Sequence, residues 1–315
     1  LLMLNSAHGK YPAGSEGWIQ ALAHAIRETA SEGTTFICST EPIPWDLAAY
    51  LAGQSCARTE IIIKSPETSR SRAEFTRLLE DFGMDERRTK PVYLKEHPAS
   101  LSHPKDCWQS RDRVALALAD IVYPVSIRPG GRLDHMLEEP SFRGKVRDDF
   151  RIAWSETRLN TRYFLTGRTW NPLPPGDWLT HWTRARPGKW PGERSYDFFR
   201  DMLSQPETYV RSAEETLLRI VREGRIRGSS WKTPGGSPLV AFTALSLGDA
   251  QALMRWRKRF VRYSFEPYGV AIRKEALIRL GASAVAYDHV KNEAGSSVRV
   301  FTHAPGKDDH WAAER

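Results

Sequence analysis

The chain has 315 residues, and its 46 Lys and Arg against 38 Asp and Glu give a formal net charge of +8 and a pI near 9.4. That length is enough for two domains of ordinary size. The excess positive charge favours an anionic partner, with nucleic acid as the first candidate and a membrane surface as the second. A basic protein without such a partner is the alternative. No apolar run approaches the ~18 residues that a membrane-spanning helix needs.

The cysteine content bounds the class of protein further. Cys38, Cys56 and Cys107 are odd in number and are not spaced as metal ligands. No secretory signal is recognisable in the sequence. We therefore expect a cytoplasmic protein without a disulfide framework. The sequence has no His-Glu-x-x-His motif and no cluster of Cys and His, so we expect no metal and no resident cofactor.

Strand and helix signals alternate through the first part of the chain. We predict strands at residues 1–5, 34–39, 60–64, 91–94 and 121–126, alternating with helices at 16–31, 44–52, 70–82, 108–119 and 132–139. This alternation is typical of an α/β domain with a parallel sheet and right-handed crossovers. We expect a Rossmann-like domain over residues 1–140.

The second part of the chain has a different pattern. Pro and Gly dominate the region after residue 140, so residues 141–190 are predicted to form a linker and the start of a second domain. Residues 191–315 are predicted to form a smaller, basic α+β domain. Its helices are expected at 196–203, 213–223, 247–260 and 274–280, and its strands at 239–243, 268–272, 284–287 and 298–302.

Polar and charged residues follow the predicted strands of the first domain. The carboxyl ends of parallel strands meet at one edge of a sheet, so these side chains are expected to converge there. The set comprises Asn5, Ser6, His8 and Lys10; Thr40, Glu41, Asp46 and Lys64; Arg111, Asp112 and Arg113; and Ser126 and Arg128. Phosphate-binding cations beside carboxylates can open an N-glycosidic bond, with Asp112, Glu41 or Asp46 as the catalyst. The alternative is that these three carboxylates only start helices or form a turn.

A glycine turn adds a phosphate-binding signal. An apolar run ends in Ser126-Ile127-Arg128-Pro129-Gly130-Gly131, just before a predicted helix. Glycines let backbone N–H groups approach a phosphate closely, which is the role predicted for Gly130 and Gly131 together with Ser126 and Arg128. Asn5, Ser6 and Lys10 are expected to bind the same nucleotide or phosphate.

These motifs resemble those of the SLOG superfamily over residues 1–140. The glycine turn, with Glu138-Glu139 after it, is similar to the Pro-Gly-Gly-x-Gly-Thr-x-x-Glu signature of the lonely-guy phosphoribohydrolases. Arg111-Asp112-Arg113 resembles the Arg-Asn-Arg motif of the DNA-processing protein A group. The resemblance implies that the domain binds a nucleotide or single-stranded DNA, with Arg111 and Arg113 as DNA contacts. Because Arg132-Leu133-Asp134 replaces x-Gly-Thr and the acidic pair comes late, Glu138 is not carried over as a catalyst.

The second domain resembles a different family. The segments Leu179-Thr180-His181-Trp182-Thr183-Arg184 and Phe265-Glu266-Pro267-Tyr268-Gly269 occur in the order of a divergent ADP-ribosyltransferase core of the DarT kind, or of the related abortive-infection domains. The resemblance implies that His181 and Thr183 hold NAD and that Glu266 is catalytic. The alternative for Glu266 is a turn residue before Pro267.

A basic run in the second domain favours nucleic acid as the partner. Residues 255–263 interleave five cations with three aromatic residues, as a surface that tracks phosphates and stacks on bases requires. The predicted DNA contacts are Arg255, Trp256, Arg257, Lys258, Arg259 and Arg262. The alternative is the solvated face of a helix whose Trp256 and Phe260 pack inward.

Both resemblances concern the C1′–N bond of a nucleoside, in families that recur in defence against phage. We therefore predict a phage-defence enzyme, a DNA glycosylase that excises a base, modified or unmodified, from DNA. Base flipping suits a basic chain with 11 Trp, because the extruded base needs stacking partners. The first alternative is an NAD-dependent ADP-ribosyltransferase that modifies nucleic acid. The second is a non-catalytic module that senses nucleotides or binds DNA.

Overall fold

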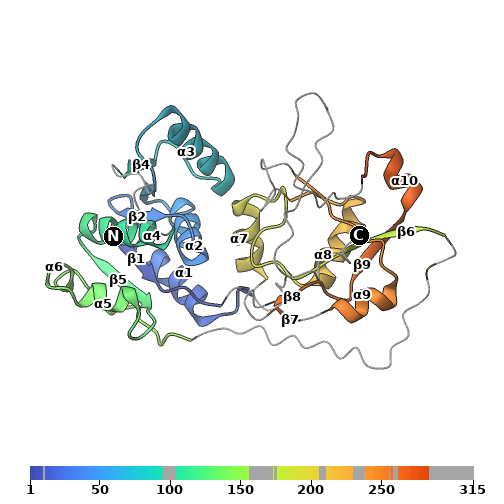
Figure 1. Cartoon of the computed structure of the whole chain (residues 1–315). Helices are drawn as coiled ribbons and strands as arrows, with labels where there is room; N and C mark the ends of the chain where they lie inside the picture. The colour runs from blue at the N-terminus through green and yellow to red at the C-terminus, as the bar shows by residue number, and fades with distance from the viewer. Residues whose placement is uncertain are drawn as a thin grey trace. The chain divides into compact units, whose positions relative to one another are not determined.

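The computed structural model describes residues 1–9, 11–94, 104–155, 173, 176–205, 211–229, 238–254, 256–257 and 262–283 (Figure 1). Contacts between residues divide the chain into two compact units. The first unit comprises Leu1–Leu159 and Pro187–Val210, and the second comprises Asn160–Arg186 and Arg211–Arg315. This division differs from the predicted boundaries, because the segment Pro187–Val210 belongs to the first unit.

Parallel strands form the centre of the first unit. Strands β1 (Leu2–Asn5) and β5 (Val122–Ser126) pair with each other, and β2 (Thr35–Ser39), β3 (Arg58–Ile63) and β4 (Thr89–Tyr93) form a second parallel set. Two hydrogen bonds of 2.7 Å, from the Leu1 amino group to the Thr35 carbonyl and from the Ile37 N–H to the Leu1 carbonyl, link β1 to β2. The strands thus follow the order β5-β1-β2-β3-β4, and the predicted α/β class with parallel pairing is confirmed.

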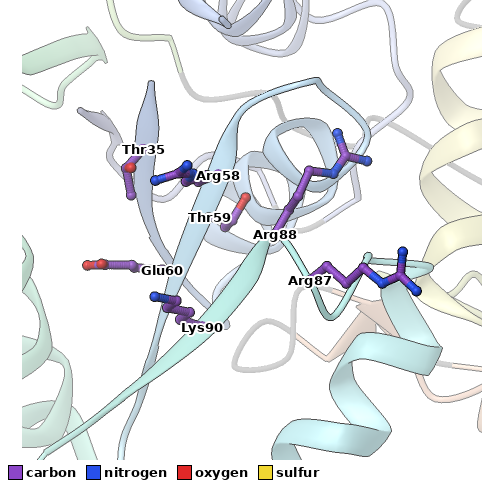
Figure 2. Close-up of a pocket in the computed structure, with 7 residues that line it drawn as sticks. All are labelled: Thr35, Arg58, Thr59, Glu60, Arg87, Arg88 and Lys90. Carbon is purple, nitrogen blue, oxygen red and sulfur yellow. The ribbon is translucent and has the colours of Figure 1, made fainter. Parts of the chain in front are cut away.

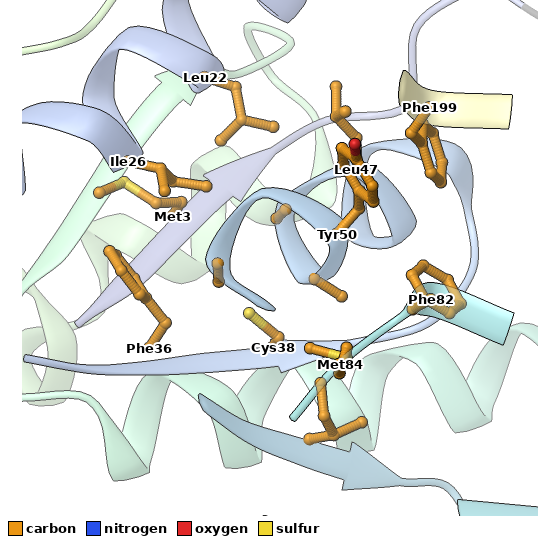
Figure 3. Packing of buried hydrophobic residues seen from close by; sticks show 14 of the residues in the cluster. Met3, Leu22, Ile26, Phe36, Cys38, Leu47, Tyr50, Phe82, Met84 and Phe199 are labelled. Carbon is orange, nitrogen blue, oxygen red and sulfur yellow. The ribbon is translucent and has the colours of Figure 1, made fainter. Parts of the chain in front are cut away.

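Helices cover both faces of these strands. The helices of the first unit are α1 (Gly17–Thr29), α2 (Ile43–Gly53), α3 (Ser69–Phe82), α4 (Pro104–Leu118), α5 (Arg132–Glu138), α6 (Pro140–Arg143) and α7 (Ser195–Ser204). Successive residues of a strand point to opposite faces. In β2, Phe36 and Cys38 therefore pack with α1, α2 and α3 (Figure 3), whereas Ile37 lies in a second cluster with residues of α4, α5 and α6.

The segment Pro187–Val210 completes one of these faces. Phe199 of α7 lies 5.5 Å from the ring of Tyr50 in α2 and 6.3 Å from that of Phe82 in α3, measured between ring centroids. The ammonium of Lys189 approaches the carboxylate of Asp81 to 2.5 Å, and the Ser195 hydroxyl donates to the same carboxylate at 2.6 Å. Apolar packing and a partly exposed ion pair thus hold α7 against α2 and α3.

The second unit contains short helices and antiparallel strand pairs. Strand β6 (Trp178–Trp182) pairs with β9 (Gly269–Arg273), and β7 (Trp256–Arg257) pairs with β8 (Arg262–Tyr263). Its helices are α8 (Ala213–Glu223), α9 (Leu247–Leu253) and α10 (Lys274–Arg279). Gly224 ends α8 with a φ of 62°, the left-handed conformation that glycine commonly supplies at the end of a helix.

Four secondary-structure predictions fail in the second unit or lie outside the described residues. The helix predicted at 247–260 ends at Leu253, and part of its remainder is the strand β7. The strand predicted at 239–243 is reduced to isolated bridges at Leu239 and Thr243. The strands predicted at 284–287 and 298–302 lie outside the described ranges. No helix in the described part of the chain is both long and apolar enough to span a membrane.

Candidate functional site

The carboxyl ends of β1 and β5 are the place where the strand order reverses. Strands β2, β3 and β4 follow one another on one side of β1. Strand β5 then pairs with the other side of β1. In open α/β sheets, ligands bind in the crevice that such a reversal leaves at the carboxyl ends of the strands. The residues that follow β1 and β5 are therefore the first candidates for a binding site.

Asn5 of β1 and Ser126 of β5 lie at this reversal and pair with each other across the two strands. The register shifts between Leu4 and Asn5, so that Leu4 faces Pro124 while Asn5 faces Ser126. Proline has no N–H to give to the ladder, and a bulge re-aims the side chain next to it. Asn5 is 6% exposed and Ser126 is 0% exposed. The structure thus buries two polar side chains side by side at the strand ends.

These two buried side chains lack hydrogen-bond partners. Neither Oδ1 nor Nδ2 of Asn5, nor Oγ of Ser126, has a partner among the described residues. A buried polar group left unsatisfied costs about 1–3 kcal/mol, and such a group in a native structure needs an explanation. A bound molecule that offers both a donor and an acceptor would satisfy all three atoms.

Ser6 and Arg128 lie beside Asn5 and Ser126 at the same strand ends. The Ser6 N–H donates to the Ser126 carbonyl, and the Arg128 N–H donates to Oγ of Ser6, both at 2.9 Å. The Arg128 side chain is exposed, and its guanidinium carbon lies 5.4 Å from the centre of the Trp154 ring. Because the Trp154 ring supports the guanidinium, Arg128 presents a positioned cation beside these strand ends.

An aromatic stack lies next to Arg128. The His8 ring is parallel to that of Trp18 at 4.7 Å and lies 6.1 Å from that of Trp154. His8 Nδ1 lies 3.1 Å from the Ser155 carbonyl, while its Nε2 is buried without a partner among the described residues. Burial lowers the pKa of His8, which favours the neutral ring at pH 7. Trp18 and Trp154 could not be predicted as part of this site, since no motif in the sequence links them to the strand ends.

The glycine turn does not form the predicted phosphate cradle. The Gly130 N–H donates to Oδ2 of Asp134 at 2.9 Å, and the Gly131 N–H donates to the Arg128 carbonyl at 3.0 Å. Both N–H groups are therefore used within the turn, and the anion that Gly130 binds is a carboxylate of this chain. The glycines serve the turn geometry: Gly130 has a φ of 65°, and a Cβ on Gly131 would lie 2.9 Å from the Arg128 carbonyl oxygen.

Arg111 and Asp112 form a buried ion pair, which corrects two predictions. Arg111 is 1% exposed and Asp112 is 0% exposed. Oδ1 of Asp112 accepts from Nε and Nη2 of Arg111 at 2.9 and 2.6 Å, and its Oδ2 accepts from Arg132 at 2.6 Å. Arg111 also donates to the carbonyls of Thr40 and Glu41. Arg111 thus holds the loop after β2 and does not face DNA, and both oxygens of Asp112 are engaged by arginines in a buried ion pair.

Asp46 is the carboxylate at this edge that titrates near neutrality. Its Oδ1 accepts the Glu41 N–H at 2.9 Å, and the Glu41 backbone has a φ of 54°. Burial raises the pKa of Asp46 to about 7. The exposed Glu41 carboxylate instead pairs with Lys64 at 3.1 Å. Asp46 is therefore suited to accept or donate a proton at physiological pH.

Two further predictions in the first unit concern Arg113 and Lys10. Both guanidinium nitrogens of Arg113 bind the Glu139 carboxylate, at 2.9 and 2.8 Å, on the surface. Arg113 is therefore held in a partly exposed ion pair with Glu139, and a phosphate could bind Arg113 only by breaking that pair. Lys10 lies outside the described residues.

In the second unit, Thr183 and Glu266 are joined through their backbones, and the side chains of His181, Thr183 and Glu266 each bind other backbone groups of the unit. The Glu266 N–H donates to the Thr183 carbonyl at 3.2 Å. The Thr183 hydroxyl donates to the Ala213 carbonyl at 2.7 Å, and Glu266 Oε1 accepts the Ala185 N–H at 2.6 Å. His181 Nδ1 lies 2.8 Å from the Ala241 carbonyl, and burial lowers its pKa. These contacts hold loops against β6, so the catalytic role of Glu266 stays a prediction.

The basic run is a pair of short strands where it is described. Trp256 faces Tyr263, and Arg257 faces Arg262 across β7 and β8. Arg255, Lys258 and Arg259 lie outside the described residues, so their contact with DNA stays a prediction.

The described residues contain no group of three or more His, Cys, Asp or Glu side chains that could hold a metal ion. Comparison with known proteins finds no matching family model, no matching curated sequence and no matching solved structure.

Proposed function

We propose that the first unit is a Rossmann-like domain that binds a nucleotide at the carboxyl ends of β1 and β5. We propose further that it hydrolyses the N-glycosidic bond of that nucleotide within DNA, as a DNA glycosylase of phage defence does. The observation that carries the proposal is the pair of buried, unsatisfied side chains Asn5 and Ser126. An amide that offers one donor and one acceptor matches the edge of a nucleobase.

The other residues at this edge have the chemistry that the reaction needs. Asp46, with a pKa of about 7, takes a proton from water. The water oxygen then bonds to C1′ of the sugar while the C1′–N bond breaks. The base leaves with that electron pair and takes up a proton from solvent. The exposed guanidinium of Arg128 binds the phosphate of the same nucleotide.

A second candidate function is ADP-ribosyl transfer from NAD in the second unit. The observation in its favour is the hydrogen bond from Glu266 to the Thr183 carbonyl, with His181 on the adjoining strand β6. The first unit would then hold the nucleic acid that is modified. This candidate is weaker because the Thr183 hydroxyl and a Glu266 oxygen are occupied within the unit.

One experiment separates these functions. The purified chain is incubated with phage genomic DNA, with and without NAD, and released bases and nicotinamide are measured by mass spectrometry. We expect a free base and alkali-labile sites without NAD, lost in Asp46→Asn and retained in the matched surface variant Glu139→Gln. Nicotinamide release that requires NAD would establish the transferase instead. DNA binding without either product would leave a binding module and overturn the proposal.

A further inference from the structure

A cationic hollow lies at the opposite edge of the first unit from the candidate site. It has a volume of about 330 Å³ and opens at the amino ends of β2, β3 and β4 (Figure 2). Its lining contains four cationic side chains, Arg58, Arg87, Arg88 and Lys90, together with Glu60 and two threonines. A five-residue strand such as β2 separates the two edges by about 16 Å.

Most of the positive charge in this hollow is not neutralised by the protein. Arg88 binds Asp85 at 3.2 Å and the Ser55 carbonyl at 3.0 Å. Arg58, Arg87 and Lys90 are exposed, and their side chains form no ion pair with any residue that the structure describes. Glu60 is the one carboxylate in the lining, facing Lys90 on the neighbouring strand. Cations gathered in this way attract an anion from solution.

The directions of these side chains favour an extended anion over a compact one. In Figure 2, Arg87 and Arg88 extend away from Arg58 and Lys90, so the four cations do not converge on one point. A single phosphate would contact one or two of them. A chain of phosphates would contact all of them in turn.

We propose that this hollow binds the phosphodiester backbone of a nucleic acid, as an anchor remote from the reaction edge. The inference rests on the proposed function for its choice of polyanion. Contacts of this kind hold the strand without reading its sequence. The anchor therefore raises affinity for any DNA while leaving the strand ends at Asn5 and Ser126 available for one nucleotide.

The test is the salt dependence of binding to a fluorescent single-stranded oligonucleotide by the full chain. Each phosphate contact contributes about 0.7 to the slope of log affinity against log salt for single strands. Arg58→Ala with Arg87→Ala should therefore lower the slope by about 1.4. The matched control is Arg27→Ala with Arg70→Ala, which removes two exposed arginines elsewhere on the first unit. Arg58→Lys with Arg87→Lys, which keeps the charge, should retain most of the affinity.

An unchanged slope in the Arg58/Arg87 variant, or an equal fall in the control, would overturn the anchor. Inorganic triphosphate that displaces the oligonucleotide at low concentration would instead identify a compact phosphate ligand and also overturn it. The result is separable from the proposed function. Base release that persists at saturating DNA while the slope is unchanged rejects only the anchor, whereas a lower slope without base release rejects only the glycosylase.

Discussion

Asn5 and Ser126 face each other across β1 and β5 with their side-chain polar atoms buried and without a partner in the described part of the chain. A fold selected for stability alone would place apolar side chains at these positions. The two residues therefore cost the unliganded protein stability, and a ligand that satisfies them would restore it.

Two serines in matched positions allow a measurement of how much an unsatisfied buried hydroxyl lowers the free energy of unfolding. Ser126 and Ser39 are both fully buried at the ends of strands, but the Ser39 hydroxyl donates to the Ile62 carbonyl at 3.0 Å. Ser39→Ala should lower the free energy of unfolding by about 1 kcal/mol, whereas Ser126→Ala should leave it unchanged or raise it. Urea denaturation gives both values. Equal losses in the two variants would mean that Ser126 is satisfied without a ligand.

Asn5→Leu tests the ligand directly. Leucine has the same number of side-chain heavy atoms and the same branching as asparagine and removes both unsatisfied atoms, so the free protein should be at least as stable as the wild type. Binding of a nucleotide or of DNA should no longer raise the melting temperature, since the amide that recognises the base is lost. Differential scanning fluorimetry with and without oligonucleotide measures both effects. Retained stabilisation by the oligonucleotide would exclude Asn5 from the site.

Asp46 should make both stability and activity depend on pH. Its folded-state pKa of about 7 lies above the ordinary value of 3.8, so between these values the folded chain binds a proton that the unfolded chain has lost. The free energy of unfolding contributed by this group therefore falls as the pH rises through that window. Asp46→Asn should remove this fall. Base release by the wild type should increase as the pH rises through about 7, because the ionised carboxylate is the base.

The buried pair of Arg111 and Asp112 should matter for folding and not for chemistry. Asp112→Asn leaves the buried Arg111 guanidinium without its counter-charge, which should cost about 3–5 kcal/mol of unfolding free energy. Glu139→Gln, which breaks the exposed pair with Arg113, should cost less than about 1 kcal/mol. Chemical denaturation of the two variants gives the comparison. Wild-type stability with lost activity in Asp112→Asn would return Asp112 to the candidate catalysts.

Phe199 should contribute to the first unit as a core residue. It is buried against Tyr50 and Phe82, so Phe199→Ala should lower the free energy of unfolding by about 3–5 kcal/mol. Hydrogen exchange should show faster exchange of amides in α2 and α3, which α7 covers. Faster exchange confined to the second unit would contradict the assignment of α7.

The sequence predicted those features of the first unit that depend on local pattern. The apolar, β-branched runs around Ile37 and Ile62 are buried on both faces, and their composition was sufficient to identify parallel strands. The convergence of Asn5, Ser6 and Ser126 followed from the same reasoning, because parallel strands share a carboxyl edge.

Features that depend on distant contacts could not be predicted. The glycine turn has the same sequence pattern whether Gly130 binds a phosphate or the carboxylate of Asp134. The hydrogen bond to Asp134 is seen only in the folded structure. Arg111 looked like a surface cation because nothing in the sequence shows that Trp45 covers it at 4.4 Å. The raised pKa of Asp46 also depends on burial by tertiary packing.

The interleaved order of the two units has a consequence for how the chain is made and cut. The backbone passes between the units at 159/160, 186/187 and 210/211. During synthesis, Asn160–Arg186 therefore leaves the ribosome before Phe199 does. Tyr50 and Phe82 cannot complete their packing against Phe199 until that segment of the second unit has been made. No single cleavage of the backbone separates the two units. A protease that cuts one of the three connections leaves the units covalently joined through another.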